Sequence, residues 1–236
     1  MEELMPLFYY FDPTYILIII GVIICSIASM NVNYTYKKYS TVRSMTGMTG
    51  AQAAQQLLHT AGIYDVSIQH VPGNLTDHYD PRNKVLRLSD TVFNSPSVAA
   101  IGVAAHECGH AIQHQKGYVP LVIRSALVPV AQFGSGISWP IIIAGIFFGY
   151  NQTLINIGIL LFSAAVLFQI VTLPVEINAS RRAVRLLKDT GILRNDEAVC
   201  TKKVLGAAAL TYVASAAAAI LQLLRLVILF GGRNDD

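Results

Sequence analysis

The sequence predicts a mainly α-helical integral membrane protein, in which a helical bundle crosses the bilayer and a small α+β portion lies outside it. Hydrophobic residues make up 53% of the 236 residues and charged residues only 13%, whereas soluble domains contain about 25% charged residues. Four apolar stretches are long enough to cross a bilayer as helices. The sizeable polar part of the chain lies between the first two of them.

The predicted spans follow from length, because a membrane helix needs about 20 consecutive apolar residues. The second span contains Gly134, Gly136 and Pro140, which membrane helices tolerate when neighbouring groups pair with the freed backbone atoms. The spans are predicted at residues 14–30, 128–148, 154–175 and 207–230 of a single domain that covers residues 1–236.

Basic residues concentrate in two of the segments that join the spans. Of the 17 Lys and Arg residues, 8 lie between the first and second spans and 7 between the third and fourth, and the turn near Asn151 has none. The positive-inside rule therefore predicts a cytoplasmic portion at 31–118, a cytoplasmic helical segment at 176–206 and an N-terminus outside. No Lys or Arg precedes the first span, which argues against a cleaved signal peptide.

The cytoplasmic portion is predicted to combine helices with short strands. Thr49 begins an amphipathic helical pattern, and alternation at 66–70 and 85–88 predicts two strands that could form a hairpin. The Asp-His-Tyr-Asp-Pro run at 77–81 is typical of a turn, because Asp and Pro are common turn residues. A further helix is expected at 96–115, with Ser95 as its N-cap and proline at its first position.

A His-Glu-Cys-Gly-His run lies within this last helix. Residues at i and i+4 share one helix face, so His106 and His110 can bind one metal ion. Glu107, one residue on, can reach a zinc-bound water and take its proton without binding the metal. This H-E-x-x-H arrangement predicts one Zn²⁺ per chain and metallopeptidase chemistry. The alternative is a core helix whose polar residues align by chance, although their unpaired burial would be costly.

A third protein ligand is expected, because catalytic zinc takes three and leaves one position open. His114 lies two turns along the helix from His106, and each turn rises about 5.4 Å, so His114 is expected at the surface. Glu176, at the cytoplasmic end of the third span, is the candidate, since carboxylates so close to hydrocarbon are functional candidates. The alternative is an ion pair with Arg181 or Arg182, or a helix-terminal charge that the dipole favours.

Long runs of the sequence match a known family. They lie at 12–15, 75–82, 104–107, 109–114, 173–176 and 178–183. In these runs the chain resembles the YugP-type bacterial membrane zinc metallopeptidases, a gluzincin-like family related to HtpX-type membrane proteases. The resemblance implies His106, His110 and Glu176 as zinc ligands and Glu107 as the base. In the wider clan an Asp often stands four residues after the third ligand, where this chain has Ser180, so the partner of each histidine stays unassigned.

Other residues of the matching runs have no assigned role. His78 could stabilise an oxyanion, but for Asp77, His78 and Asp80 the turn interpretation is preferred. By analogy with related proteases, the strand at 85–88 could offer an edge to an extended peptide. Cys108 is expected to pack in the interior, and the orientation of Tyr212 is undecided.

The favoured function is a membrane-embedded zinc endopeptidase that cleaves membrane-associated or cytoplasmic-face polypeptides in a bacterial cell membrane. The fold is thus a membrane helical bundle with a small α+β cytoplasmic metalloprotease portion. An inactive zinc-binding scaffold is the first alternative, and a transporter the second, which the few polar residues within the spans disfavour. Expected partners are a polypeptide, the lipid bilayer and an unspecified homo-oligomer or membrane protein. The net charge of +3 gives no reason to expect nucleic acid.

Overall fold

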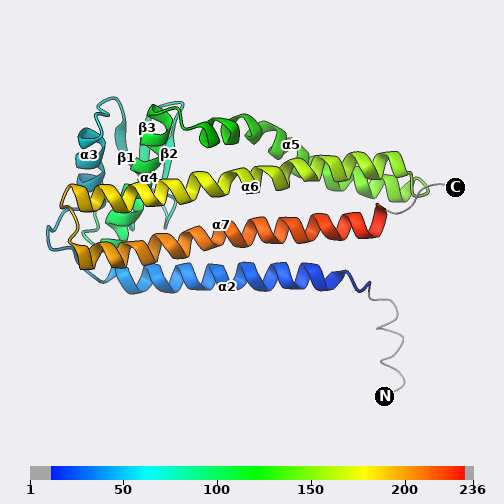
Figure 1. The fold of residues 1–236 in the computed structure, drawn as a ribbon, viewed down its shortest axis with the longest axis horizontal. Coiled ribbons are helices and arrows are strands. Elements are labelled where there is room, and N and C mark those ends of the chain that lie inside the picture. The colour runs from blue at the N-terminus through cyan, green and yellow to red at the C-terminus, as the bar shows by residue number, and fades with distance from the viewer. Residues whose placement is uncertain (1–11, 232–236) are drawn as a thin grey trace, which may run out of the picture. The chain divides into compact units, whose positions relative to one another are not determined.

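The computed structural model describes residues 12–231, which are mainly helical as predicted (Figure 1). The described residues form six helices and three short strands. In chain order these elements are α2 (Tyr15–Ser40), α3 (Gly50–Thr60), β1 (Ser67–Val71), β2 (His78–Asp80), β3 (Val85–Ser89), α4 (Val98–Gln115), α5 (Val119–Phe147), α6 (Gln152–Asp189) and α7 (Asn195–Phe230).

Four of the helices, α2, α5, α6 and α7, are long and apolar enough to cross a membrane, which confirms the four predicted apolar helices. The 38 residues of α6 correspond to about 57 Å at 1.5 Å per residue, nearly twice a hydrocarbon core of about 30 Å. The sequence predicted a separate helical segment from Glu176, but α6 continues through Pro174 and Glu176 without a break. Part of α6 therefore extends beyond the length needed to cross the bilayer.

The contacts group the described chain into two compact units. One contains residues 12–27, 124–171 and 213–231, which are the most apolar parts of the long helices. Within it α5 and α6 approach closely, since a Cβ added at Gly134 would lie 2.6 Å from the Leu161 carbonyl oxygen. Arg225 of α7 is paired in this unit: its Nη2 donates to Asp12 Oδ2 at 3.2 Å.

The other unit contains residues 28–123 and 172–212, and its sheet has the strand order β1-β3-β2. β3 pairs parallel with β1 and antiparallel with β2, so the predicted hairpin of 66–70 with 85–88 is wrong. The suggestion that 85–88 offers a free edge is wrong as well, because β3 is the central strand.

The run predicted as a turn contains strand β2, and the turn follows it. Asp80 Oδ1 accepts hydrogen bonds from the backbone N–H groups of Arg82 at 3.0 Å and Asn83 at 3.2 Å. Lys84 then has φ +51°, which completes the reversal into β3. β2 is therefore an edge strand of the sheet and contacts α4. With three residues it is too short to show an alternating pattern in the sequence.

Helix α4 is buried along most of its length in the core of this second unit. It begins later than predicted, with Ser97 as the N-cap, because Val98 N–H donates to the Val42 carbonyl at 2.9 Å and holds the preceding residues extended. Gly109 lies where α4 meets α6: a Cβ there would be 2.7 Å from the Ala179 carbonyl oxygen. Glycine is therefore needed for the close approach of the two helices.

Candidate metal centre

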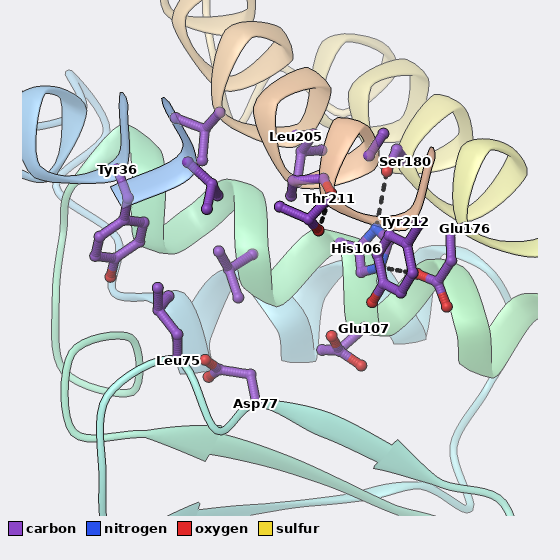
Figure 2. A pocket seen from close by; sticks show the side chains of 15 residues that line it. Tyr36, Leu75, Asp77, His106, Glu107, Glu176, Ser180, Leu205, Thr211 and Tyr212 are labelled. Carbon is purple, nitrogen blue, oxygen red and sulfur yellow. Dashed lines mark hydrogen bonds and ion pairs between the residues drawn. The ribbon is translucent and has the colours of Figure 1, made fainter. Parts of the chain in front are cut away.

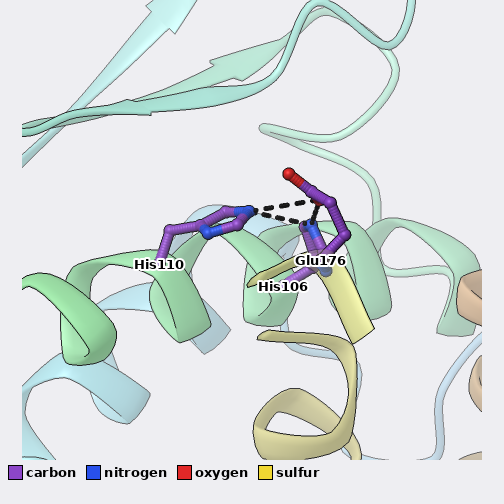
Figure 3. Close-up of side chains that lie close together, drawn as sticks. All are labelled: His106, His110 and Glu176. Carbon is purple, nitrogen blue, oxygen red and sulfur yellow. Dashed lines mark hydrogen bonds and ion pairs between the residues drawn. The ribbon is translucent and has the colours of Figure 1, made fainter. Parts of the chain in front are cut away.

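Three ligand-type side chains converge where α4 and α6 meet (Figure 3). His106 and His110 project from successive turns of α4, and Glu176 reaches them from α6. His106 Nε2 and His110 Nε2 are 3.1 Å apart. Glu176 Oε2 is 3.2 Å from the first nitrogen and 3.5 Å from the second. The structure thus brings together residues 70 positions apart in the sequence.

These separations suit one tetrahedral ion. With zinc–nitrogen bonds near 2.0–2.1 Å, two ligands at the tetrahedral angle lie about 3.3 Å apart. The three measured distances fall between 3.1 and 3.5 Å. Two imidazoles and a carboxylate are also the donor set of known catalytic zinc sites. The residues present therefore fit a zinc ion.

A directional hydrogen-bond network fixes the tautomer of His110. The carbonyl of Val175 can only accept, so the Gln113 atom 2.8 Å away is the amide nitrogen, which also donates to Asn178 Oδ1 at 3.0 Å. Gln113 Oε1 then faces His110 Nδ1 at 3.0 Å and accepts a hydrogen bond from the N–H group at that position. In the neutral imidazole this leaves the lone pair of His110 Nε2 directed at Glu176.

The facing atoms of His110 and Glu176 are therefore both acceptors, and a cation between them would satisfy both. Burial alone would lower the pKa of His110. The Glu176 carboxylate, to which only the protonated ring can donate, and the negative charges of Glu107 and Glu176 raise this pKa above its ordinary value. The electrostatic environment of this site favours positive charge.

Ser180, one helical turn after Glu176, is the partner of the other histidine. Its hydroxyl lies 3.0 Å from His106 Nδ1. The sequence left the partner of each histidine unassigned, and the structure supplies Ser180 for His106 and Gln113 for His110. Ser180 could have been proposed from the sequence, because it stands four residues after Glu176. The role of Gln113 could not, because it depends on how α4 packs on α6.

We call His106, His110 and Glu176 the metal-ligand cluster. Two of its members, His106 and Glu176, line a cavity of about 230 Å³ within the second unit (Figure 2). Its walls come from α2, α4, α6, α7 and the segment before β2. The lining residues are Val32, Tyr36, Leu75, Asp77, Val103, His106, Glu107, Glu176, Ser180, Val204, Leu205, Ala208, Ala209, Thr211 and Tyr212. Glu107 is buried yet borders this cavity, so its carboxylate is available to a molecule bound there.

Asp77, in the segment before β2, borders the same cavity on the side to which Glu107 points (Figure 2). Its two oxygens accept from the N–H of Ser89 at 2.8 Å and from the Ser89 hydroxyl at 2.9 Å. Burial raises the pKa of Asp77, and the charge of Glu107 raises it further, although both hydrogen bonds oppose the shift. Asp77 thus ties the cavity wall to the end of β3.

Other residues singled out in the sequence lie elsewhere. His78 and Asp80 do not line the cavity; Asp80 Oδ2 accepts from Arg87 at 3.0 Å. His114 Nδ1 is 2.9 Å from the Tyr79 hydroxyl at the surface. Cys108 is buried in the core, and burial raises the pKa of its thiol. Tyr212, undecided from the sequence, borders the cavity.

Comparisons with known proteins identify the family. A family described as "Putative neutral zinc metallopeptidase" matches residues 14–231, and the chain belongs to it. The chain is also 47% identical over 210 residues to "Putative membrane protease YugP" of Bacillus subtilis (strain 168), covering 89% of this chain and 93% of that protein. These findings confirm the resemblance to the YugP-type family. No solved structure matches the chain.

The role of Gln113 can be tested with Gln113→Leu, which keeps the volume and removes the hydrogen bonds. Loss of a group that orients a metal-bound histidine typically lowers metal affinity 10–100-fold. We expect such a loss in a zinc competition titration with a chelator. The matched control is Gln115→Leu on the exposed face of the same helix, which should bind zinc like the wild type. Equal affinity of both variants would contradict this role for Gln113.

Proposed function

We propose that this chain is a membrane zinc endopeptidase in which His106, His110 and Glu176 hold one Zn²⁺ and Glu107 is the general base. The observation that carries the proposal is the convergence of three ligand atoms, 3.1–3.5 Å apart. Two of the residues that supply them, His106 and Glu176, line a cavity that Glu107 also borders. Membership of a zinc metallopeptidase family supports it.

Each residue then has a distinct task. A zinc ion held by His106, His110 and Glu176 would supply Lewis acidity toward a substrate carbonyl and a water molecule. Glu107 would take a proton from the water as its oxygen bonds to the peptide carbonyl carbon, and would give that proton to the amine nitrogen as the C–N bond breaks. Gln113 and Ser180 hold the two imidazoles in the orientation that the ligands need. Because Glu107 is buried, bulk water solvates its carboxylate only weakly.

The proposed substrate is a polypeptide at or near the membrane surface. Most residues of the cavity wall contributed by α7 are apolar, and α7 is itself a candidate membrane span. The outer edge of β2 is available to pair with an extended peptide, the common mode of strand addition. A polypeptide that emerges from the bilayer, or lies along its cytoplasmic face, would suit this environment.

An inactive zinc-binding scaffold is the second candidate. Such a protein would need the three ligands but no base, whereas here a carboxylate that is only 8% exposed borders the cavity beside them. Burying a carboxylate costs free energy unless it is paired or hydrogen-bonded, and a scaffold without activity would gain nothing from that cost. The position of Glu107 therefore favours the enzyme.

The substitution Glu107→Gln distinguishes the two functions. The amide keeps the shape of the side chain but cannot accept the proton, so cleavage of casein should fall by at least about 100-fold. Zinc content should stay close to one per chain, because Glu107 does not bind the metal. Zinc content is measured on detergent-purified protein by mass spectrometry, and cleavage with and without chelator.

Two results would contradict the assignment of Glu107. Loss of zinc from Glu107→Gln would make this residue a ligand or a structural support of the ligands. Cleavage at the wild-type rate, still abolished by chelator, would place the base elsewhere.

We also propose that the active site faces the cytoplasm and that the N-terminus lies outside. The supporting observation is the concentration of 15 of the 17 basic residues in two connecting segments, as the positive-inside rule requires. Residues 28–123 and 172–212, which include most of these basic residues, also form one compact unit.

Cysteine labelling tests this orientation in intact cells. In a background with Cys25, Cys108 and Cys200 replaced, Asn151→Cys should react with a membrane-impermeant thiol reagent. Asn83→Cys should react only after the cells are opened, because the membrane keeps the reagent from the cytoplasm. Both asparagines are exposed in the fold, so burial would not prevent labelling at either position. Labelling of Asn83→Cys from outside would overturn the cytoplasmic active site.

A further inference from the structure

A second cavity, of about 330 Å³, lies between α6 and α7 in the unit that holds the metal-ligand cluster. We call it the α6–α7 groove. Its lining residues are Ile177, Ser180, Arg181, Val184, Lys188, Lys202, Leu205, Gly206 and Ala209. On both helices these residues follow the i, i+3, i+4, i+7 spacing that places side chains on one face, so each helix contributes one continuous stripe.

Three cations border the groove: Arg181 and Lys188 from α6, and Lys202 from α7. All three are exposed, and none forms an ion pair with a carboxylate within residues 12–231. By contrast, Arg87 and Arg225 each pair with an aspartate. The groove therefore concentrates positive charge that the described protein does not neutralise.

Between the cations the groove is apolar. Ile177 and Val184 face it from α6, and Leu205 and Ala209 from α7. Both helices are candidate membrane spans. The span predicted from the sequence ends at residue 175 in α6 and begins at residue 207 in α7, and both positions are next to the groove. A ligand with an anionic head and an apolar tail would match both the cations and the surface between them.

Gly206 adds an independent observation about the shape of the groove. A glycine inside a helix costs about 0.5–1 kcal/mol relative to alanine. Gly102 and Gly109 have a packing reason, since a Cβ at either would lie within 3 Å of a neighbour. A Cβ at Gly206 would meet nothing within 4 Å. Packing against other residues therefore does not require glycine there, and its missing side chain leaves the groove open.

We propose that the α6–α7 groove binds an anionic phospholipid. Arg181, Lys188 and Lys202 contact the phosphate, and an acyl chain lies against Ile177 and Leu205 and continues into the bilayer. Basic pockets between membrane helices on the cytoplasmic side recognise lipid headgroups in this way, and arginine suits phosphate because its donors form a planar fork. The apolar surface distinguishes a lipid from free phosphate, which would leave it exposed.

The test uses the full chain in an uncharged detergent, with bound lipid counted by native mass spectrometry. Phosphatidylglycerol should be retained in preference to phosphatidylcholine, and inorganic phosphate at the same concentration should not displace it. The double variant Arg181→Gln/Lys202→Gln should bind phosphatidylglycerol at least about tenfold more weakly, because each cation near a lipid phosphate contributes substantially to binding. Gly206→Leu, which fills the groove, should have a similar effect.

The matched control is Arg185→Gln/Lys203→Gln. It removes one arginine from α6 and one lysine from α7, both exposed but outside the groove, and should bind phosphatidylglycerol like the wild type. Equal weakening in both double variants would show non-specific charge attraction and overturn the proposal. Full displacement by inorganic phosphate, or unchanged binding in Gly206→Leu, would overturn it as well. Because binding is counted directly, neither outcome depends on peptidase activity.

Discussion

The close approach of α4 to α6 at Gly109 is the constraint on which the metal centre depends. The Ala179 carbonyl oxygen would lie 2.7 Å from a Cβ at Gly109, so any side chain larger than hydrogen would push α6 away. Glu176 and Ser180 lie on α6 on either side of Ala179. Because both contact His106 at 3.0–3.2 Å, a shift of about 1 Å would disrupt the arrangement that a tetrahedral ion needs.

The same helix contact organises the polar groups around the cluster. Gln113 on α4 donates to the Val175 carbonyl and to Asn178 on α6, and Arg182 also donates to Asn178, at 2.6 Å. In this series of hydrogen bonds each group can act only as a donor or only as an acceptor. The series therefore fixes the tautomer of His110. Hydrogen bonds that are linked in this way hold the side chains in one arrangement. The helix crossing therefore fixes the orientation of the ligands as well as their separation.

Parts of this account could be predicted from the sequence because they depend on local periodicity. The i, i+4 spacing of His106 and His110 needs only a helix, and four apolar runs of membrane length need only composition. Glu176 was reached by elimination and by resemblance to a family. The order of the strands was not predictable. β2 has only three residues, too few for a clear alternation, and β1 pairs in parallel with β3, which lies beyond β2 in the chain.

The positions of Gln113, Asp77 and Tyr212 show a second limit. Gln113 and Tyr212 stand in helices, and Asp77 stands in the segment before β2. The sequence alone does not decide which way these polar side chains point. Gln113 donates to groups 62 and 65 residues away. The cavity wall that Asp77 and Tyr212 border combines residues from α2, α4, α6 and α7. The α6–α7 groove likewise arises only when two separate helices lie side by side. Packing, rather than local preference, decides these features.

We propose that one zinc ion joins α4 to α6 through Glu176. The zinc content of purified Glu176→Ala, compared with His110→Ala and the wild type after dialysis against a weak chelator, tests this. We expect about one zinc per wild-type chain and loss of most zinc from both variants, since two protein ligands are left in each. Full zinc retention in Glu176→Ala, with loss in His110→Ala, would contradict the claim and assign the third ligand to another residue.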